Sequence, residues 1–266
     1  MKIGILSSGQ ETLALFSFLS RYDHEYLVYY DSLHASYGEK NFSTALLAVE
    51  QGIARLKNAG AETIILPPVY ELALLKKGEK LILPLFQSYL LEEVFPHSLV
   101  GKLGLLGELA DLQIAQELIA DLASSYIPTE AQRSTKVFSF PFHFRAKEVG
   151  ILNPLLTRLS RKSFLTNTLL KHELRYFKDA RVDTLIPLNY LYFNAETTIS
   201  KFLNFKKIRF HRLSKLEQIF THLTQKGKKS DYSVQIHATD QREHLLREKR
   251  MLRKLQRGKT IEIQRS

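Results

Sequence analysis

The chain has 266 residues, of which 44% are hydrophobic and 24% charged, and a formal net charge of +11. This length allows one large domain or two of ordinary size, each with a substantial core. The chain contains no cysteine, which excludes disulfides, thiolate metal sites and thiol catalysis. No apolar run approaches the roughly 18 residues that a membrane-spanning helix needs. We therefore expect a globular, cytoplasmic protein that does not bind membranes.

Predicted strands and helices alternate in the first part of the chain. Apolar segments of strand length lie at residues 1–6, 25–30 and 62–66, and apolar residues at helical spacing lie at 11–22 and 43–59. Gly60 is expected to end the second helix. Pro67 and Pro68 end the third strand, and a loop is predicted there. This alternation is typical of a doubly wound parallel sheet, an α/β fold.

The pattern then repeats. Residues 101–106 echo residues 1–6, and residues 183–186 echo residues 62–65, in the same order. Two echoes in order indicate two similar α/β halves with a ligand-binding cleft between them. Further elements are expected after residue 106: helices at 113–123, 162–175 and 241–257, and strands at 136–140, 233–237 and 260–263.

Motifs for metal, nucleotide or serine chemistry are missing. The sequence has no Gly-x-Gly-x-x-Gly, no phosphate-binding loop and no nucleophile elbow, and no histidine or carboxylate cluster has metal-site spacing. We therefore predict no metal and no cofactor. His34 is expected to be a solvated loop residue, and His143 and His237 are expected to be strand residues.

Several segments resemble glutamate racemases of the aspartate/glutamate racemase superfamily. Residues 1–9 resemble the opening strand and its Asp-Ser-Gly turn, and Asp31 with residues 37–40 resembles the loop over the substrate. Residues 61–69 fall where the family carries its first catalytic Cys-Asn-Thr. Residues 183–192 fall on the family's Asp-Thr-Leu-Ile-Leu-Gly-Cys-Thr-His-Tyr. The resemblance continues into the closing segment and covers nearly the whole chain.

The resemblance implies two similar doubly wound parallel-sheet domains. The first would hold residues 1–92 and 208–266, and the second residues 93–207. It also implies a cofactor-independent isomerase that uses one thiol on each side of the substrate's α-carbon. A homodimer and a role linked to peptidoglycan precursors are likewise implied by the resemblance alone.

The departures from the family pattern are concentrated at its chemistry. Ser7 replaces the acidic residue of the first turn, Pro67 and Asn189 replace the two thiols, and Leu191 replaces the histidine. Proline has no side-chain proton to exchange, and an asparagine amide is not a base near pH 7. Two-thiol racemisation is therefore excluded, and none of these four positions is expected to be catalytic.

Other positions keep groups that suit a small carboxylate or amino-acid ligand. The resemblance selects these ligand-binding candidates: Ser8, Gly9, Asp31, Tyr37, Gly38 and Tyr190. His34, Lys40 and Tyr192 are further residues that this family-like site would include. Each candidate is also a residue type common in turns or in half-buried cores, and that structural interpretation competes with the functional one.

Three functions fit the sequence. We favour a catalytically inactive homologue of glutamate racemase, a pseudoenzyme that binds a small carboxylate, an amino acid or a protein partner. The second is a racemase-like enzyme with a non-thiol mechanism, which requires clustered ionisable groups with shifted pKa values. The third is a nucleic-acid binder that uses the predicted basic helix at 241–257. Its basic residues include Arg247, Arg250, Arg253, Lys254 and Arg257.

Overall fold

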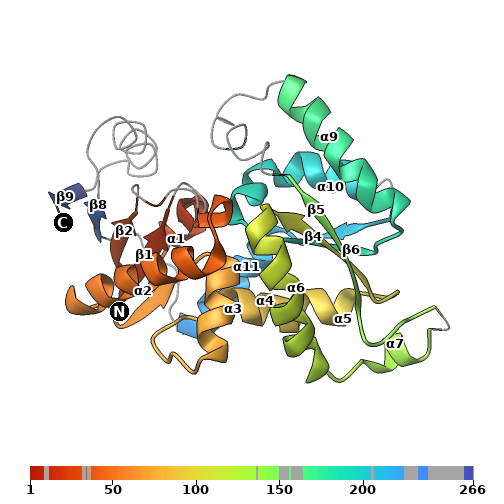
Figure 1. Cartoon of the computed structure of the whole chain (residues 1–266), viewed down its shortest axis with the longest axis horizontal. Helices are drawn as coiled ribbons and strands as arrows, with labels where there is room; N and C mark the ends of the chain where they lie inside the picture. Colours follow the sequence, from red (N-terminus) through yellow and green to blue (C-terminus); the bar gives the residue numbers. More distant parts are fainter. Residues whose placement is uncertain are drawn as a thin grey trace. The chain divides into compact units, whose positions relative to one another are not determined.

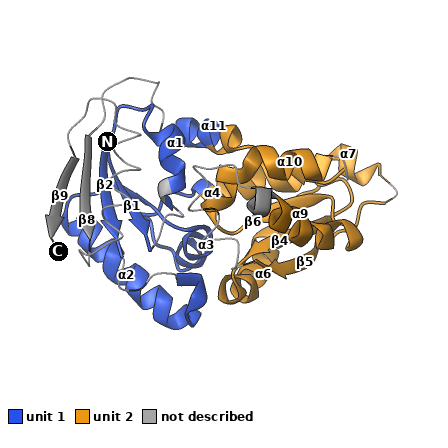
Figure 2. Ribbon diagram, turned by 90° about the horizontal axis from the view of Figure 1, so that it is seen from above, with its two compact units in different colours: residues 1–85, 217–266 blue, residues 86–216 orange. Residues whose placement is uncertain are grey.

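The computed structural model describes residues 1–8, 12–31, 34, 37–135, 137–149, 156, 164–204, 207–224, 233–238 and 261–265. The chain divides into two compact units, unit 1 (Met1–Leu85 with Glu217–Ser266) and unit 2 (Phe86–Leu216) (Figure 2). The boundaries expected from the sequence, after residues 92 and 207, both fall inside unit 2. No helix in the described ranges is long and apolar enough to cross a membrane.

Unit 1 is built on a five-stranded sheet with the strand order β3-β1-β2-β8-β9 (Figure 1). Its strands are β1 (Lys2–Ser7), β2 (Glu25–Tyr30), β3 (Thr63–Ile65), β8 (Ser233–Ala238) and β9 (Ile261–Arg265). Every neighbouring pair is parallel, so the carboxyl ends of all five strands lie at the same edge. The parallel α/β fold predicted from the sequence is confirmed.

Helix α2 (Phe42–Asn58) shows how local sequence sets an element. The Asn41 side chain accepts a hydrogen bond from the Ser43 N–H at 2.9 Å and caps the helix start. At the other end Gly60 has φ +89°, and its N–H donates to the Lys57 carbonyl while the next N–H donates to Leu56. This pair of bonds is the Schellman ending, which favours glycine because it needs a left-handed residue.

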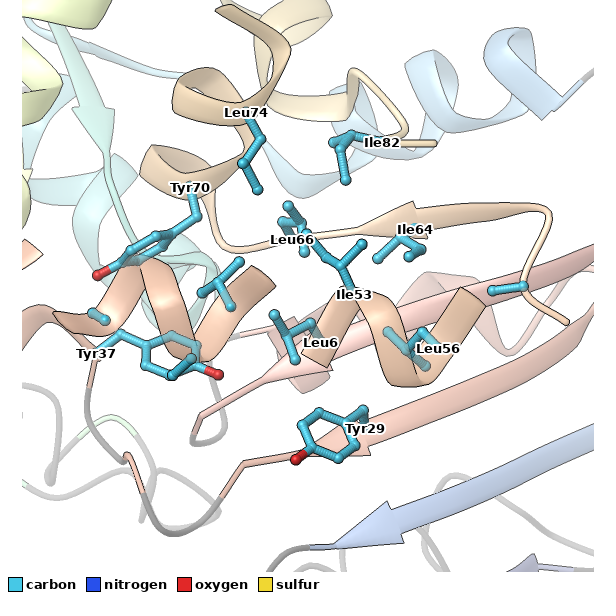
Figure 3. Packing of buried hydrophobic residues seen from close by; sticks show 14 of the residues in the cluster. Leu6, Tyr29, Tyr37, Ile53, Leu56, Ile64, Leu66, Tyr70, Leu74 and Ile82 are labelled. Carbon is cyan, nitrogen blue, oxygen red and sulfur yellow. The ribbon is translucent and has the colours of Figure 1, made fainter. Parts of the chain in front are cut away.

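Apolar side chains fill one face of the unit 1 sheet (Figure 3). Leu27 and Tyr29 of β2 belong to this cluster, whereas Tyr26 packs against Phe16 with ring centroids 5.6 Å apart. Phe16 begins α1 (Phe16–Leu19), which follows the 3-10 helix η1 (Thr12–Leu15). Because strand side chains alternate between faces, helices cover both sides of the sheet, as a doubly wound fold requires. The cluster also includes Leu6, Ile53, Leu56, Ile64, Leu66, Tyr70 and Leu74.

Unit 2 contains a four-stranded parallel sheet with the order β5-β4-β6-β7. Its strands are β4 (Lys102–Gly107), β5 (His143–Glu148), β6 (Thr184–Pro187) and β7 (Arg209–Phe210). The chain enters this unit within α4 (Leu85–Tyr89) and leaves it within α11 (Leu213–Thr224). Between them lie the π-helical turn η3 (Leu90–Val94), α5 (Phe95–His97), α6 (Leu109–Ser124), α7 (Glu130–Arg133), α9 (Phe164–Asp179), the 3-10 helix η5 (Tyr190–Ala195) and α10 (Glu196–Asn204). A second parallel sheet confirms the predicted repeat of α/β halves.

The strand predicted at residues 136–140 is wrong. The described residues of that segment lie outside any strand, and β5 begins only at His143, whose N–H donates to the residue before β4 at 2.8 Å. The alternating aromatic residues mimic a strand pattern, but they pack on one another, with the Phe140 and Phe142 ring centroids 5.7 Å apart. Pro141 between them has no N–H to donate to a sheet.

Candidate ligand-binding site

Several predicted binding residues meet at the carboxyl edge of the unit 1 sheet. Ser7 is the last residue of β1, Ser8 follows it, and Asp31 directly follows β2. Tyr37 opens the 3-10 helix η2 (Tyr37–Glu39), and all four side chains are buried. The Asp31 N–H donates to the Ser7 carbonyl at 2.8 Å, which extends the β1–β2 ladder by one residue. Parallel pairing therefore brings these residues together.

The Asp31 carboxylate is the centre of this group. It accepts hydrogen bonds from the Tyr37 hydroxyl at 2.9 Å, from His34 Nδ1 at 2.9 Å and from the His34 backbone N–H at 3.3 Å. A carboxylate only accepts, so His34 Nδ1 carries the proton in this contact. The Tyr37 N–H donates in turn to Ser8 Oγ at 3.2 Å. His34 and Tyr37 are thus tied to the residues that follow both strands.

Aromatic side chains hold Tyr37 against the core. The Tyr37 ring meets the Tyr70 ring edge-on, with centroids 5.4 Å apart, and Tyr70 stacks on Phe42 at 5.3 Å. Tyr37 and Tyr70 lie at one end of the apolar cluster in Figure 3, and Gly38 is buried beside Tyr37. Such ring contacts add about 0.5–1.5 kcal/mol each beyond their buried area. The polar group therefore has a rigid aromatic support.

Pro67 has a structural role after β3. The expected loop is short, because helix α3 (Pro68–Lys76) begins directly after Pro67, which is its N-cap residue. Pro68 fits the first helical position, where its missing N–H costs nothing and its fixed φ is already helical. The Pro67 carbonyl accepts the Glu71 N–H at 3.0 Å. At this position, which the resemblance aligns with the first thiol, the chain starts a helix.

Asn189 has a similar role in unit 2. It follows β6 and is the N-cap residue of η5, where its Oδ1 atom accepts the Leu191 N–H at 2.9 Å. Tyr190 and Leu191 are buried core residues of the same turn. The side chain aligned with the second thiol therefore satisfies a backbone donor, as N-cap asparagines commonly do.

Sequence reasoning missed two buried carboxylates in unit 2. Glu108 directly follows β4 and is the N-cap residue of α6, and Asp111 lies in the first turn of that helix; they are 4% and 7% exposed. Burial, followed by the charges of these two carboxylates, raises the pKa of Tyr192 well above its ordinary value of 10. Tyr192 therefore stays a neutral phenol. Residues 101–106 echo residues 1–6, so Glu108 corresponds to Ser8. This correspondence could have identified Glu108 from the sequence.

Some predicted residues lie outside the described part of the chain. These are Gly9 and the basic segment at 241–257 with Arg247, Arg250, Arg253, Lys254 and Arg257. Their proposed roles stay predictions.

Comparison with known proteins defines the fold. Neither a protein-family model nor a curated protein matches the sequence. A glutamate racemase isoform from Bacillus anthracis matches 99% of this chain and 96% of its own, with TM-score 0.73 and 16% identity. This chain has the glutamate racemase fold. The Francisella tularensis glutamate racemase solved with D-glutamate also matches, with TM-score 0.71 and 13% identity over 99% of this chain and 97% of that one.

A third racemase-fold neighbour is the Escherichia coli glutamate racemase, solved with L-glutamate and the activator UDP-MurNAc-Ala. It matches 98% of this chain and 97% of its own, with TM-score 0.65 and 13% identity. The likeness in all three cases is one of backbone architecture over the whole length, which supports the fold inferred from short sequence segments.

Proposed function

We propose that this protein is a catalytically inactive homologue of glutamate racemase that binds a small carboxylate, such as an acidic amino acid. The observation that carries this proposal is that the residues at the two positions aligned with the family's thiols each begin a helix. Pro67 occupies the N-cap position of α3 and the Asn189 side chain caps η5, so both residues serve local backbone structure. Neither side chain removes or supplies a proton near pH 7.

The carboxyl edge of the unit 1 sheet supports the binding half of the proposal. In open α/β sheets ligands bind outside the carboxyl ends of the strands. Hydroxyl groups of Ser7 and Ser8 suit a ligand carboxylate, and the Asp31 carboxylate suits a ligand ammonium group. The structural neighbours solved with D-glutamate and L-glutamate favour an acidic amino acid as the ligand class.

A second candidate is non-thiol proton transfer by His34. The Asp31 carboxylate holds His34 Nδ1 at 2.9 Å, which leaves Nε2 as the basic nitrogen. A carboxylate that orients a histidine in this way is the usual support of a general base. The His34 side chain is 36% exposed, so a ligand in solution can reach it. This pair is the observation that favours an active enzyme.

Binding is tested by isothermal titration calorimetry with L-glutamate, D-glutamate and L-aspartate, with L-glutamine as the ligand lacking the side-chain charge. We expect saturable binding of at least one acidic amino acid. In Tyr37→Phe, affinity is expected to fall about tenfold or more, because the hydrogen bond that positions Asp31 is lost. Tyr176→Phe, an exposed tyrosine of α9, is the matched control. The binding proposal fails if no acidic amino acid binds, or if both variants bind as wild type does.

The proposal has four remaining elements. A homodimer and a link to peptidoglycan precursors follow from the resemblance, a cytoplasmic location is expected from the sequence, and a protein partner in place of a small ligand is the other form of the pseudoenzyme hypothesis. The nucleic-acid alternative is tested by salt-dependent retention on immobilised DNA. Retention that disappears in an Arg247→Glu, Arg250→Glu double variant would favour that alternative, since each lost phosphate contact reduces the salt dependence.

A further inference from the structure

Three residues of unit 2 that are distant in sequence come together near β7. Glu93 lies in η3, His97 ends α5, and His211 directly follows β7. One possible ligand atom from each of the three residues lies within 4.8 Å of the others. His97 and His211 are more than a hundred residues apart in the chain, so no spacing motif could reveal the group.

The two carboxylate oxygens of Glu93 face different partners. Its Oε2 atom lies 3.5 Å from His211 Nδ1 and 3.9 Å from His97 Nδ1, whereas Oε1 lies 3.0 Å from Lys215 Nζ. The Glu93 side chain is only 13% exposed. One oxygen is therefore engaged with a lysine, and the other is directed at two imidazoles.

Both histidines have a nitrogen suited to metal binding. His97 Nδ1 lies 2.7 Å from the Glu93 backbone carbonyl, which only accepts, so Nδ1 carries the proton and Nε2 keeps its lone pair. Histidines that bind metal ions commonly donate their other ring N–H to such an acceptor, which fixes the orientation of the ring. His211 is 10% exposed, and its Nδ1 lies 3.5 Å from Glu93 Oε2, which is longer than an ordinary hydrogen bond, so this nitrogen has its lone pair available to an ion held by the same carboxylate.

We propose that Glu93, His97 and His211 form a binding site for one divalent transition-metal ion such as Zn²⁺. Two imidazoles and one carboxylate are typical ligands of zinc, whereas Mg²⁺ and Ca²⁺ prefer oxygen ligands only. Ligand atoms at zinc distances in a tetrahedral site lie about 3.3 Å apart. The 3.5 Å contact between Glu93 and His211 is already close to this value.

The ion would connect two distant segments of unit 2. Glu93 and His97 precede β4, and His211 lies between β7 and α11, the helix in which the chain returns to unit 1. Three protein ligands leave a fourth position for water or a solute. Lys215 opposes cation binding, because its ammonium group contacts Glu93 and is 41% exposed. Removing this charge is therefore expected to strengthen binding.

The test uses tag-free, full-length protein freed of metal with a chelator and titrated with Zn²⁺ by calorimetry. We expect one equivalent to bind, with affinity reduced roughly tenfold or more in His97→Ala and Glu93→Gln, because the two remaining groups cannot complete the site. Lys215→Ala is expected to bind several-fold more tightly. His172→Ala, an exposed histidine of α9 beside Glu173, is the control and should bind as wild type does.

Co²⁺ provides a second measurement, since its visible spectrum reports coordination by nitrogen and oxygen ligands. His211→Ala removes a buried ring, so His97→Ala, at a half-exposed position, is the variant expected to keep the fold; circular dichroism checks both. The absence of one-equivalent binding, or a His97→Ala affinity equal to that of His172→Ala, would overturn the proposal. Because no amino acid is present, the result is independent of the proposed function.

Discussion

His211 is expected to make the stability of unit 2 depend on pH. Burial, followed by His97, lowers its pKa from 6.5 to about 4, and the charges of Arg209 and Lys215 act in the same direction while Glu93 opposes them. The unfolded chain therefore binds a proton at a higher pH than the folded one. The contribution of neutral His211 is fully present above pH 6.5 and is lost as the pH falls toward 4.

The size of this effect follows from the two pKa values. At pH 5 the folded His211 is mostly neutral, whereas the unfolded imidazole is almost fully protonated. The linkage relation then gives a loss of about 2 kcal/mol of unfolding free energy between pH 7.5 and pH 5. The full difference, reached below pH 4, is about 3 kcal/mol.

The perturbation is His211→Phe, which keeps an aromatic ring of similar size and removes the titration. Urea unfolding of wild type and variant is followed by circular dichroism at pH 7.5 and pH 5, with a chelator present. We expect wild type to lose about 2 kcal/mol more than the variant, while His172→Phe, an exposed control, behaves as wild type does. Equal losses in wild type and His211→Phe, or a His211 imidazole that titrates near 6.5 by NMR, would refute the reasoning.

Three further substitutions test individual contacts. Asp31→Asn should lower the stability of unit 1 by about 2 kcal/mol in thermal unfolding, because the contact with His34 Nδ1 loses its charge; an unchanged Tm would contradict the role of this carboxylate. Asn189→Ala should cost about 1 kcal/mol, and Asn189→Ser should restore it by keeping the cap. Gly104→Ala should cost about 1–3 kcal/mol, since an added Cβ would lie 2.7 Å from the Phe177 ring; a wild-type urea midpoint would count against this packing.

Elements with strong local signals were predictable from sequence. The apolar run of β1 and the helical spacing of α2 gave their positions to within a few residues, and Gly60 ended α2 as expected. The helix predicted at 11–22 was too long, because the chain there forms a 3-10 turn and one short helix. Local periodicity does not distinguish these helix types.

Strand β5 and the long-range cluster of Glu93 with His211 were not predictable in the same way. Strand β5 lies at a sheet edge, and its sequence His-Phe-Arg-Ala-Lys-Glu lacks the apolar run of a buried strand. Residues 136–140 have a stronger strand pattern, and the strand was therefore predicted there. The meeting of Glu93 with His211 depends on how β7 is placed beside β6, which no local pattern encodes. The Asp31–Tyr37 contact, by contrast, lies within one short loop that the resemblance had already singled out.

Exchange of the substrate α-proton tests the central claim most directly. Purified protein is incubated in heavy water with L-glutamate, D-glutamate and aspartate, and loss of the Cα–H signal is followed by NMR, with an active glutamate racemase as positive control. We predict no exchange above the protein-free control, because Pro67 and Asn189 cannot transfer protons. Exchange that is abolished in His34→Ala and retained in His172→Ala would contradict the inactive-homologue account and assign the base to His34.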